Sequence, residues 1–175
     1  HSGTRSTLDA IQISDRPIAI THANPFEWHP ARRNKPNDLL KELSNSGGML
    51  GFSIYPHHLN NGSNCTLEDF CGMIARTADH MGVDRIGIGS DLCQDQPDAV
   101  VEWMRNGTWN LQSSSLMGSN KTNGFPKQPS WFQSNKDFKN IISGLHNIGF
   151  SKSEVRMIAG TNWLRFFKSS FCRQP

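Results

Sequence analysis

Three short apolar runs, separated by amphipathic segments, constrain the fold of this 175-residue chain more than any other feature. The runs PIAIT (17–21), GMLGFSIY (48–55) and RIGIGSD (85–91) have the length and β-branched content of strands, and turn-forming residues bound each of them. Because the runs are apolar rather than alternating, they are typical of strands covered on both faces. Strands that alternate with helices at this pace predict βα units and a parallel sheet.

Amphipathic patterns predict the helices around these strands. The segment KPNDLLKELSNSG (35–47) carries its leucines on one side and stops at a glycine that suits a C-cap. The segment TLEDFCGMIARTADHMG (66–82) opens with Thr66 and Asp69 at capping-box spacing. A further helix, STLDAIQIS (6–14), is expected before the first strand. Three parallel strands alone would make a thin domain, so we expect this chain to be part of a larger sheet or barrel that was cut from a longer protein.

The second half of the chain divides into two parts. Residues 92–133 are rich in Gln, Ser, Asn, Gly and Pro and show no periodicity, which is typical of a long functional loop. Residues 134–170 predict two closing helices. The first is capped by Ser134 and Asp137, and the second opens with Ser151 and Glu154 at capping-box spacing.

Composition excludes several classes of function. The formal net charge is only +3 and no Lys/Arg block reaches five residues, which argues against a nucleic-acid partner. No apolar run approaches the ~18 residues of a membrane span, and the chain does not open with a signal peptide, so localisation is left open. No CxxC spacing occurs, which argues against a structural zinc knuckle. Disulfides and buried free thiols both remain open for the four cysteines, Cys65, Cys71, Cys93 and Cys172.

Polar groups follow each predicted strand. His22 comes after the first strand, residues 55–58 after the second, and Asp91 after the third. Functional side chains of parallel α/β sheets gather at the carboxyl ends of the strands, and imidazole and carboxylate are common ligands of zinc, manganese and iron. The pattern therefore predicts a metal or acid/base site. Each residue alone also suits a structural role, as a hydrogen-bonded histidine or a turn aspartate.

Several ordered motifs resemble one family. The segments ITHANPFEWHPARRNKPNDLL (20–40), GGMLGFSIYPHHL (47–59), TLEDFCGMIARTADHMGVDRIGIGSD (66–91) and AGTNWLRFF (159–167) are similar to the membrane (renal-type) dipeptidase family of zinc peptidases. The resemblance covers nearly the whole chain apart from 92–133. It implies the C-terminal part of a (β/α)8 TIM barrel of the metal-dependent hydrolase type, incomplete in this chain, with the long loop near the active-site mouth.

The resemblance also implies roles for four residues. His1 and His22, which are 21 residues apart, match the two histidines that bind the second of two zinc ions. Arg33 matches the arginine that binds the terminal carboxylate of a short peptide substrate. Asp91 matches the aspartate that receives the substrate amino group and assists proton transfer. The implied function is binuclear zinc-dependent hydrolysis of dipeptides, and the family leaves a homodimer open.

The chain departs from the family in two ways. After the third strand it continues DLCQDQPD (91–98), where the family has Asp-Phe-Asp-Gly, so substrate preference is not determined. The His-x-Asp and bridging glutamate of the first metal, and the substrate-facing histidine, do not occur here. We therefore expect these residues alone to be inactive and to need the N-terminal half of the barrel, from the longer chain or from another chain. The alternatives are a metal-dependent amidohydrolase acting on another small amide or lactone, or a non-catalytic fragment.

The remaining polar residues singled out by the sequence are predicted to be structural. Arg32 is expected on a helix face beside Arg33, and Asn162 and Arg165 are expected to tie the last helix to the barrel. The other histidines match no ligand position and are expected at the surface or supporting other side chains; they are His29, His57, His58, His80 and His146.

Overall fold

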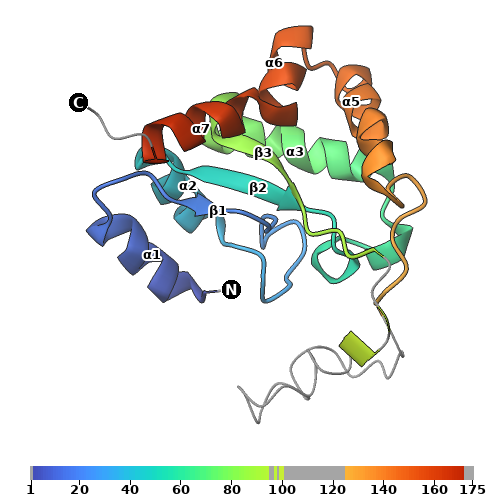
Figure 1. Ribbon diagram of the computed structural model, residues 1–175, viewed down its shortest axis with the longest axis horizontal. Helices are drawn as coiled ribbons and strands as arrows, with labels where there is room; N and C mark the ends of the chain where they lie inside the picture. The colour runs from blue at the N-terminus through green and yellow to red at the C-terminus, as the bar shows by residue number, and fades with distance from the viewer. Residues whose placement is uncertain (1, 95–96, 98, 101–124, 172–175) are drawn as a thin grey trace.

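A three-stranded parallel sheet lies at the centre of the computed structural model (Figure 1). The strands are β1 (Ala19–Ile20), β2 (Met49–Ser53) and β3 (Ile86–Ser90), in the order β1-β2-β3. Both pairings are parallel, as the alternation of apolar runs and helices predicts. The structure describes residues 2–94, 97, 99–100 and 125–171.

Helices cover both faces of the sheet (Figure 1). The main helices are α1 (Thr4–Ile13), α2 (Asn37–Asn45), α3 (Leu67–Met81), α5 (Phe138–Asn147), α6 (Lys152–Arg156) and α7 (Asn162–Phe171). The ring of Phe52 in β2 meets Phe70 of α3 edge to face, with centroids 6.4 Å apart. Its neighbour Gly51 lies against Trp163 of α7. Because successive strand residues point to opposite faces, α3 and α7 lie on opposite sides of the sheet.

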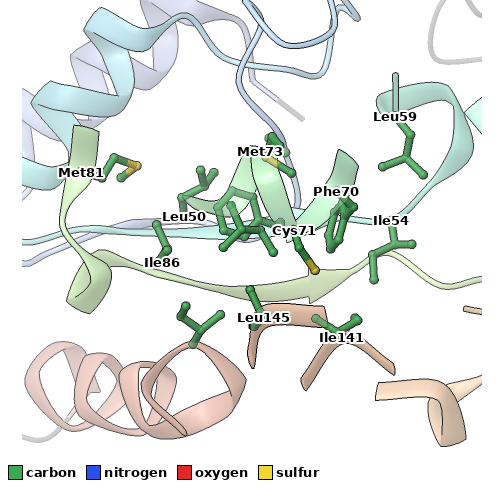
Figure 2. Close-up of a cluster of buried hydrophobic side chains, with 14 of the residues drawn as sticks. Leu50, Ile54, Leu59, Phe70, Cys71, Met73, Met81, Ile86, Ile141 and Leu145 are labelled. Carbon is green, nitrogen blue, oxygen red and sulfur yellow. The ribbon is translucent and has the colours of Figure 1, made fainter. Parts of the chain in front are cut away.

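One apolar cluster holds the sheet to its helices (Figure 2). Leu50 of β2 and Ile86 of β3 are fully buried and share this cluster with Phe70 of α3. Ile141 and Leu145 of α5 belong to the same cluster, so the closing helices are part of the core. Burial of each such side chain stabilises the fold by about 1.5–3 kcal/mol. This cluster therefore stabilises the sheet from which the loops after the strands extend.

On the face of the sheet opposite α3, glycine residues let other groups approach the strands closely. A Cβ atom on Gly87 would lie 2.5 Å from Nε1 of Trp163. A Cβ atom on Gly89 would lie 1.7 Å from the carbonyl oxygen of Thr21, which follows β1. Both distances are shorter than van der Waals contact allows. The β1 end and the Trp163 ring therefore occupy space that any larger residue at these positions would need.

Most predicted elements are confirmed, although some boundaries differ. The first strand contains two residues rather than five. The capping boxes at Ser134 and Ser151 are both formed. The second closing helix is divided into α6 and α7 by a π turn, η6 (Met157–Thr161), because the backbone of Gly160 is extended rather than helical. Within the described residues, no helix has the length and apolar character needed to cross a membrane.

Residues 125–133, at the C-terminal end of the long 92–133 segment, include side chains that belong to the core. Phe132 is fully buried, and Nε1 of Trp131 donates a hydrogen bond of 2.8 Å to the carbonyl of Cys65. Residues 95–96, 98 and 101–124 of this predicted loop lie outside the described residues.

Three cysteines, Cys65, Cys71 and Cys93, carry free thiols. Burial raises the pKa of Cys65 and of Cys71 to about 12, so both thiols stay protonated at neutral pH. The fourth, Cys172, lies outside the described residues. The open question between disulfides and free thiols is therefore answered in favour of free thiols at three of the four positions.

Candidate active site

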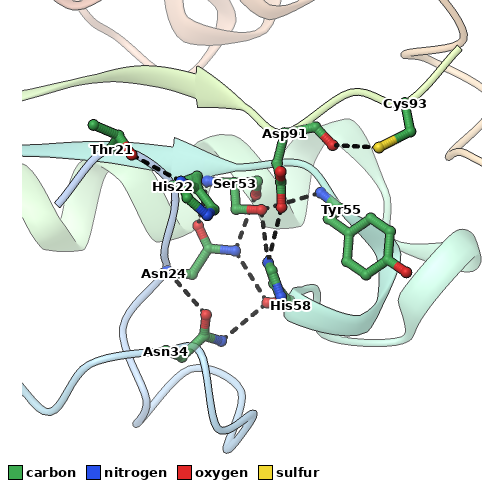
Figure 3. Close-up of polar contacts among 9 residues, drawn as sticks. All are labelled: Thr21, His22, Asn24, Asn34, Ser53, Tyr55, His58, Asp91 and Cys93. Atoms are coloured by element: carbon green, nitrogen blue, oxygen red, sulfur yellow. Dashed lines mark hydrogen bonds and ion pairs between the residues drawn. The ribbon is translucent and has the colours of Figure 1, made fainter. Parts of the chain in front are cut away.

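The residues predicted for the site come from the loops that follow the three strands (Figure 3). His22 follows β1, and Asp91 directly follows β3. Between them, β2 leads into the 3-10 turn η1 (Pro56–His58). Because the strands are parallel, their carboxyl ends meet at one edge of the sheet, and the three loops face a common region.

His22 carries a neutral imidazole at neutral pH. Its Nδ1 atom lies 2.8 Å from Oγ1 of Thr21, which orients the ring. Burial lowers the pKa of His22, and the nearby positive charge of Arg33 lowers that pKa further. The neutral ring is the form of histidine that binds metal ions.

Asp91 is held in an unusual backbone conformation. The φ angles of Ser90 and Asp91 are 36° and 60°, and the Asp91 N–H donates to the carbonyl of Gly89 over 2.6 Å. Two successive side-chain-bearing residues with positive φ are uncommon, and such backbone is concentrated at functional sites. Burial raises the pKa of Asp91, while the positive charge of Arg33 opposes that rise.

Arg33 links the other two candidates electrostatically. Its side chain is half-buried in the loop after β1. Burial lowers the pKa of Arg33, and the Asp91 carboxylate raises it. Since the pKa of an arginine starts far above neutrality, the guanidinium stays charged. The charge of Arg33 also lowers the pKa of His22, so all three candidates belong to one electrostatic site.

His58 joins this site although the sequence assigned it no specific role. Its ring is buried, with Nδ1 2.8 Å from Oγ of Ser53 and 3.8 Å from Oδ2 of Asp91 (Figure 3). Burial first, and then the charge of Arg33, lowers the pKa of His58 to about 3. The contact with Asp91 is therefore between a carboxylate and a neutral imidazole. This geometry agrees with the expectation that His58 supports another side chain. The sequence feature that could have indicated a role in the site was the position of His58 just after β2.

Two buried asparagines, which sequence reasoning missed, hold the loops together (Figure 3). The side-chain NH2 of Asn24 donates to the carbonyls of Ser53 and His58, each over 3.0 Å. The side-chain NH2 of Asn34 donates to the same His58 carbonyl over 3.0 Å, and its Oδ1 accepts from the Asn24 N–H over 2.9 Å. These bonds tie the loop after β1 to the turn after β2. The only sequence signal was their place beside the candidate residues.

A small cavity lies beside the site. Its volume is about 120 Å³, and its walls include His22, Arg33 and Lys35 together with residues of α1 and β1. Lys35 is buried and donates a hydrogen bond of 2.6 Å from Nζ to the carbonyl of Ser2. Sites for small-molecule ligands usually measure about 300–1,000 Å³, so this cavity is smaller than a complete ligand site.

His22 fits a metal, but the described residues do not build a complete metal site. A catalytic zinc ion usually has three protein ligands. Among residues 2–94, 97, 99–100 and 125–171, no group of three or more His, Cys, Asp or Glu side chains is placed to hold an ion. His1, the other predicted ligand, lies outside the described residues. The neutral imidazole of His22 therefore fits one ligand position, and the other ligands would have to come from residues beyond those described.

The family is established by comparison with known sequences. A family model described as membrane dipeptidase (peptidase family M19) matches residues 1–106, a range that contains His22, Arg33 and Asp91. The chain belongs to the membrane dipeptidase family. The resemblance inferred from the sequence motifs is thereby confirmed.

The curated proteins of the dipeptidase type that are similar to this chain are much longer than the chain itself. Dipeptidase tcpJ of Claviceps purpurea is 20% identical over 169 residues, which cover 96% of this chain and 33% of the relative. Dipeptidase ataJ of Aspergillus terreus is 24% identical over 170 residues, which cover 96% of this chain and 34% of the relative. The chain thus spans about a third of the length of these relatives.

Solved structures share the fold of this chain. An amidohydrolase from Pseudomonas aeruginosa superposes with a TM-score of 0.84 at 24% identity, over 97% of this chain and 50% of that protein. A metallopeptidase from Rhodobacter sphaeroides, liganded with a phosphinate mimic of the dipeptide L-Ala-D-Ala, superposes with a TM-score of 0.71 at 17% identity. That match covers 94% of this chain and 39% of the metallopeptidase. At these identities the likeness establishes the α/β fold.

Proposed function

We propose that the full-length protein containing these residues hydrolyses dipeptides in a zinc-dependent reaction. One observation carries the proposal: His22 and Arg33, from the loop after β1, and Asp91, from the loop after β3, form one electrostatic site at the carboxyl edge of a parallel sheet. Membership of the membrane dipeptidase family supports it.

The metal would be held partly by this chain. His1 and His22 would bind one of two zinc ions, and the remaining ligands would come from outside these residues. When bound, zinc supplies Lewis-acid polarisation of the scissile carbonyl. The protein's own contribution at His22 is a half-buried imidazole that burial and Arg33 keep neutral, with its ring oriented by Thr21.

The substrate would be held at both ends. The guanidinium of Arg33 would bind the terminal carboxylate in a bidentate pair, and the Asp91 carboxylate would bind the terminal ammonium. Two anchors at a set separation select a substrate of two residues and hold its peptide bond in place for attack. Asp91 would also take a proton from the attacking water and pass it to the leaving amine as the peptide bond breaks.

We propose further that the sheet is part of a (β/α)8 barrel, completed by an N-terminal half in the longer chain or in another chain. The three parallel strands leave β1 and β3 at the edges of the described sheet, and parallel edges normally need cover. The superposition on half of the Pseudomonas amidohydrolase supports the same conclusion.

The test is hydrolysis by the full-length protein. Its purified form is assayed with a dipeptide, the corresponding tripeptide, the N-acetylated dipeptide and the dipeptide amide. We expect cleavage of the dipeptide alone, lost after chelation and restored by zinc, because only the dipeptide offers both charged ends at the right separation. Equal cleavage of all four compounds would contradict the two-anchor arrangement.

A second candidate is hydrolysis of another small amide or a lactone. The observation that raises it is the superposition of 97% of this chain on a Pseudomonas protein described as an amidohydrolase. Hydrolysis of neutral amides or lactones, without hydrolysis of dipeptides, would support this alternative over dipeptide hydrolysis.

A further inference from the structure

His58 contacts groups from all three strand ends. Its backbone carbonyl accepts hydrogen bonds from Asn24 and Asn34, which follow β1. Its Nδ1 atom lies 2.8 Å from Oγ of Ser53, the last residue of β2. The same nitrogen lies 3.8 Å from Oδ2 of Asp91, which follows β3. The ring and the backbone carbonyl of this one residue thus join the segments at the ends of all three strands.

The groups around Nδ1 of the neutral His58 ring bear on which ring nitrogen carries the proton. Oγ of Ser53 already accepts a hydrogen bond of 3.2 Å from the N–H of Tyr55, and it retains room for a second donor. A lone pair on Nδ1 would face the Asp91 carboxylate at 3.8 Å and repel it. A proton on Nδ1 would be donated to Oγ of Ser53 over 2.8 Å, and it would attract the Asp91 carboxylate at 3.8 Å without forming a hydrogen bond to it. The surroundings therefore favour the Nδ1–H tautomer, and the low pKa of His58 agrees with a ring that is not doubly protonated.

The same network also reaches Arg33. Asn34 is the next residue in the chain, and its side chain is fixed by the carbonyl of His58 and the N–H of Asn24. The turn that presents His58 to Asp91 is therefore hydrogen-bonded to the segment that presents Arg33. Because all four polar residues of this network are buried, water does not compete strongly for these bonds. The four residues, Asn24, Asn34, Ser53 and His58, are called the loop network.

We propose that His58 is a positioning residue: its Nδ1–H, hydrogen-bonded to Ser53, attracts the Asp91 carboxylate over 3.8 Å, so that the loop network sets the separation between Asp91 and Arg33. The role of this separation, selection of substrates by length, rests on the proposed function. The backbone supports the same idea, since the positive φ angles of Ser90 and Asp91 aim the carboxylate toward the ring. The loop network would thus keep the two substrate-binding groups, Arg33 and Asp91, at a fixed separation.

The kinetic test compares three variants of the full-length protein. His58→Leu removes both ring nitrogens, and His58→Asn keeps an N–H donor near the position of Nδ1. His57→Leu is the matched control, because His57 lies on the same turn and is exposed. For each protein, kcat and KM are measured with a dipeptide and with the corresponding tripeptide.

We expect His58→Leu to lower the ratio of dipeptide to tripeptide kcat/KM by about tenfold or more, since a loosened anchor no longer selects for length. We expect His58→Asn to keep the ratio within about threefold of the wild type, and His57→Leu to leave it unchanged. Equal losses in His58→Asn and His58→Leu would overturn the proposal, because the ring volume rather than the donor would then matter. An unchanged ratio in His58→Leu would overturn it as well.

A spectroscopic test separates this proposal from the proposed function. In full-length protein labelled with ¹⁵N-histidine, the two ring nitrogens of His58 report which one carries the proton. We expect the Nδ1–H tautomer at neutral pH, with a Nδ1 shift that changes in Asp91→Asn. An Nε2–H tautomer would refute the contact whatever the enzyme cleaves. If the tautomer is as expected and no dipeptide is cleaved, the proposed function fails while the His58–Asp91 contact stands.

Discussion

Arg32 and Arg33 are sequence neighbours whose side chains meet different surroundings. Arg32 is exposed, whereas Arg33 is half-buried and shares an electrostatic site with Asp91 and His22. A guanidinium that is partly removed from water binds a carboxylate more strongly than one in solvent. The adjacent pair therefore offers an internal comparison for the proposed binding of substrate.

We expect Arg33→Ala to raise KM for dipeptides by about 10- to 100-fold, because a charged hydrogen-bonded contact contributes about 1.5–3 kcal/mol. The expected change in kcat is smaller, since the contact is formed in both the ground state and the transition state. Steady-state kinetics of the full-length protein measure both constants. Arg32→Ala is the control, and a similar rise in KM for both variants would show that general charge, rather than a specific contact at Arg33, is responsible.

His22→Ala is expected to remove the second zinc ion from the full-length protein and to abolish its hydrolytic activity. The reason is that zinc sites with only two protein ligands are weak, and the change would leave at most one histidine from this chain at that ion. Zinc content per chain after extensive dialysis is the measurement. His29→Ala is the matched control, because His29 follows the same strand but matches no ligand position. Two zinc ions retained by His22→Ala would disprove the assignment.

At the scale of whole elements, the packing of α5 on α3 depends on one glycine. A Cβ atom on Gly144 of α5 would lie 2.7 Å from Sγ of Cys71 and 3.0 Å from Cγ of Leu67, both in α3. Gly72 lies within α3 itself, and a Cβ atom there would meet only the end of the Arg76 side chain at 3.6 Å. Two glycines in helix interiors thus differ in whether there is space for a methyl group.

The two Gly→Ala changes are therefore expected to have opposite signs. Gly144→Ala should lower the free energy of unfolding by about 1–3 kcal/mol, because the two helices must move apart. Gly72→Ala should raise it by about 0.5–1 kcal/mol, because alanine loses less backbone entropy in a helix. Denaturant unfolding of the full-length protein measures both. Stabilisation by both substitutions would mean that α5 does not pack this closely on α3.

The last helix is attached to the sheet as the sequence predicted. Asn162 is buried at the start of α7, and its side-chain NH2 donates to the carbonyls of Val83 and Ile86, each over 2.8 Å. Arg165 donates to the carbonyl of Asp84 and lies 3.8 Å from its carboxylate. These contacts join α7 to β3 and to the turn before it. The expected structural role of both residues is confirmed.

At the scale of the whole molecule, the chain covers about a third of the length of these curated relatives, yet it contains His22, Arg33 and Asp91 of the candidate site. We expect the isolated 175-residue chain to hold at most one weakly bound zinc ion per molecule after dialysis, because it supplies too few ligands. We also expect it to be inactive toward dipeptides. The full-length protein should hold two zinc ions.

Metal analysis of both proteins, side by side, checks this expectation. Two tightly held zinc ions in the isolated chain would show that its own residues, including those outside the described ranges, complete both sites. Loss of the metal by chelation should abolish hydrolysis by the full-length protein. Activity that survives complete removal of zinc would contradict the proposed function itself.

The order of the residues was enough to predict the local features of this protein: the helices, the strands, the capping boxes at Ser134 and Ser151, and the motifs of its family. These features depend on residues a few positions apart, whose periodicity and hydrogen bonds are visible in the order of the letters. The packing of the whole chain brings His58, rather than His57, to Asp91 and places Asn24 and Asn34 against the carbonyl of His58. Such contacts join residues far apart in the chain, and they depend on strand register and burial, which the packing of the whole fold determines.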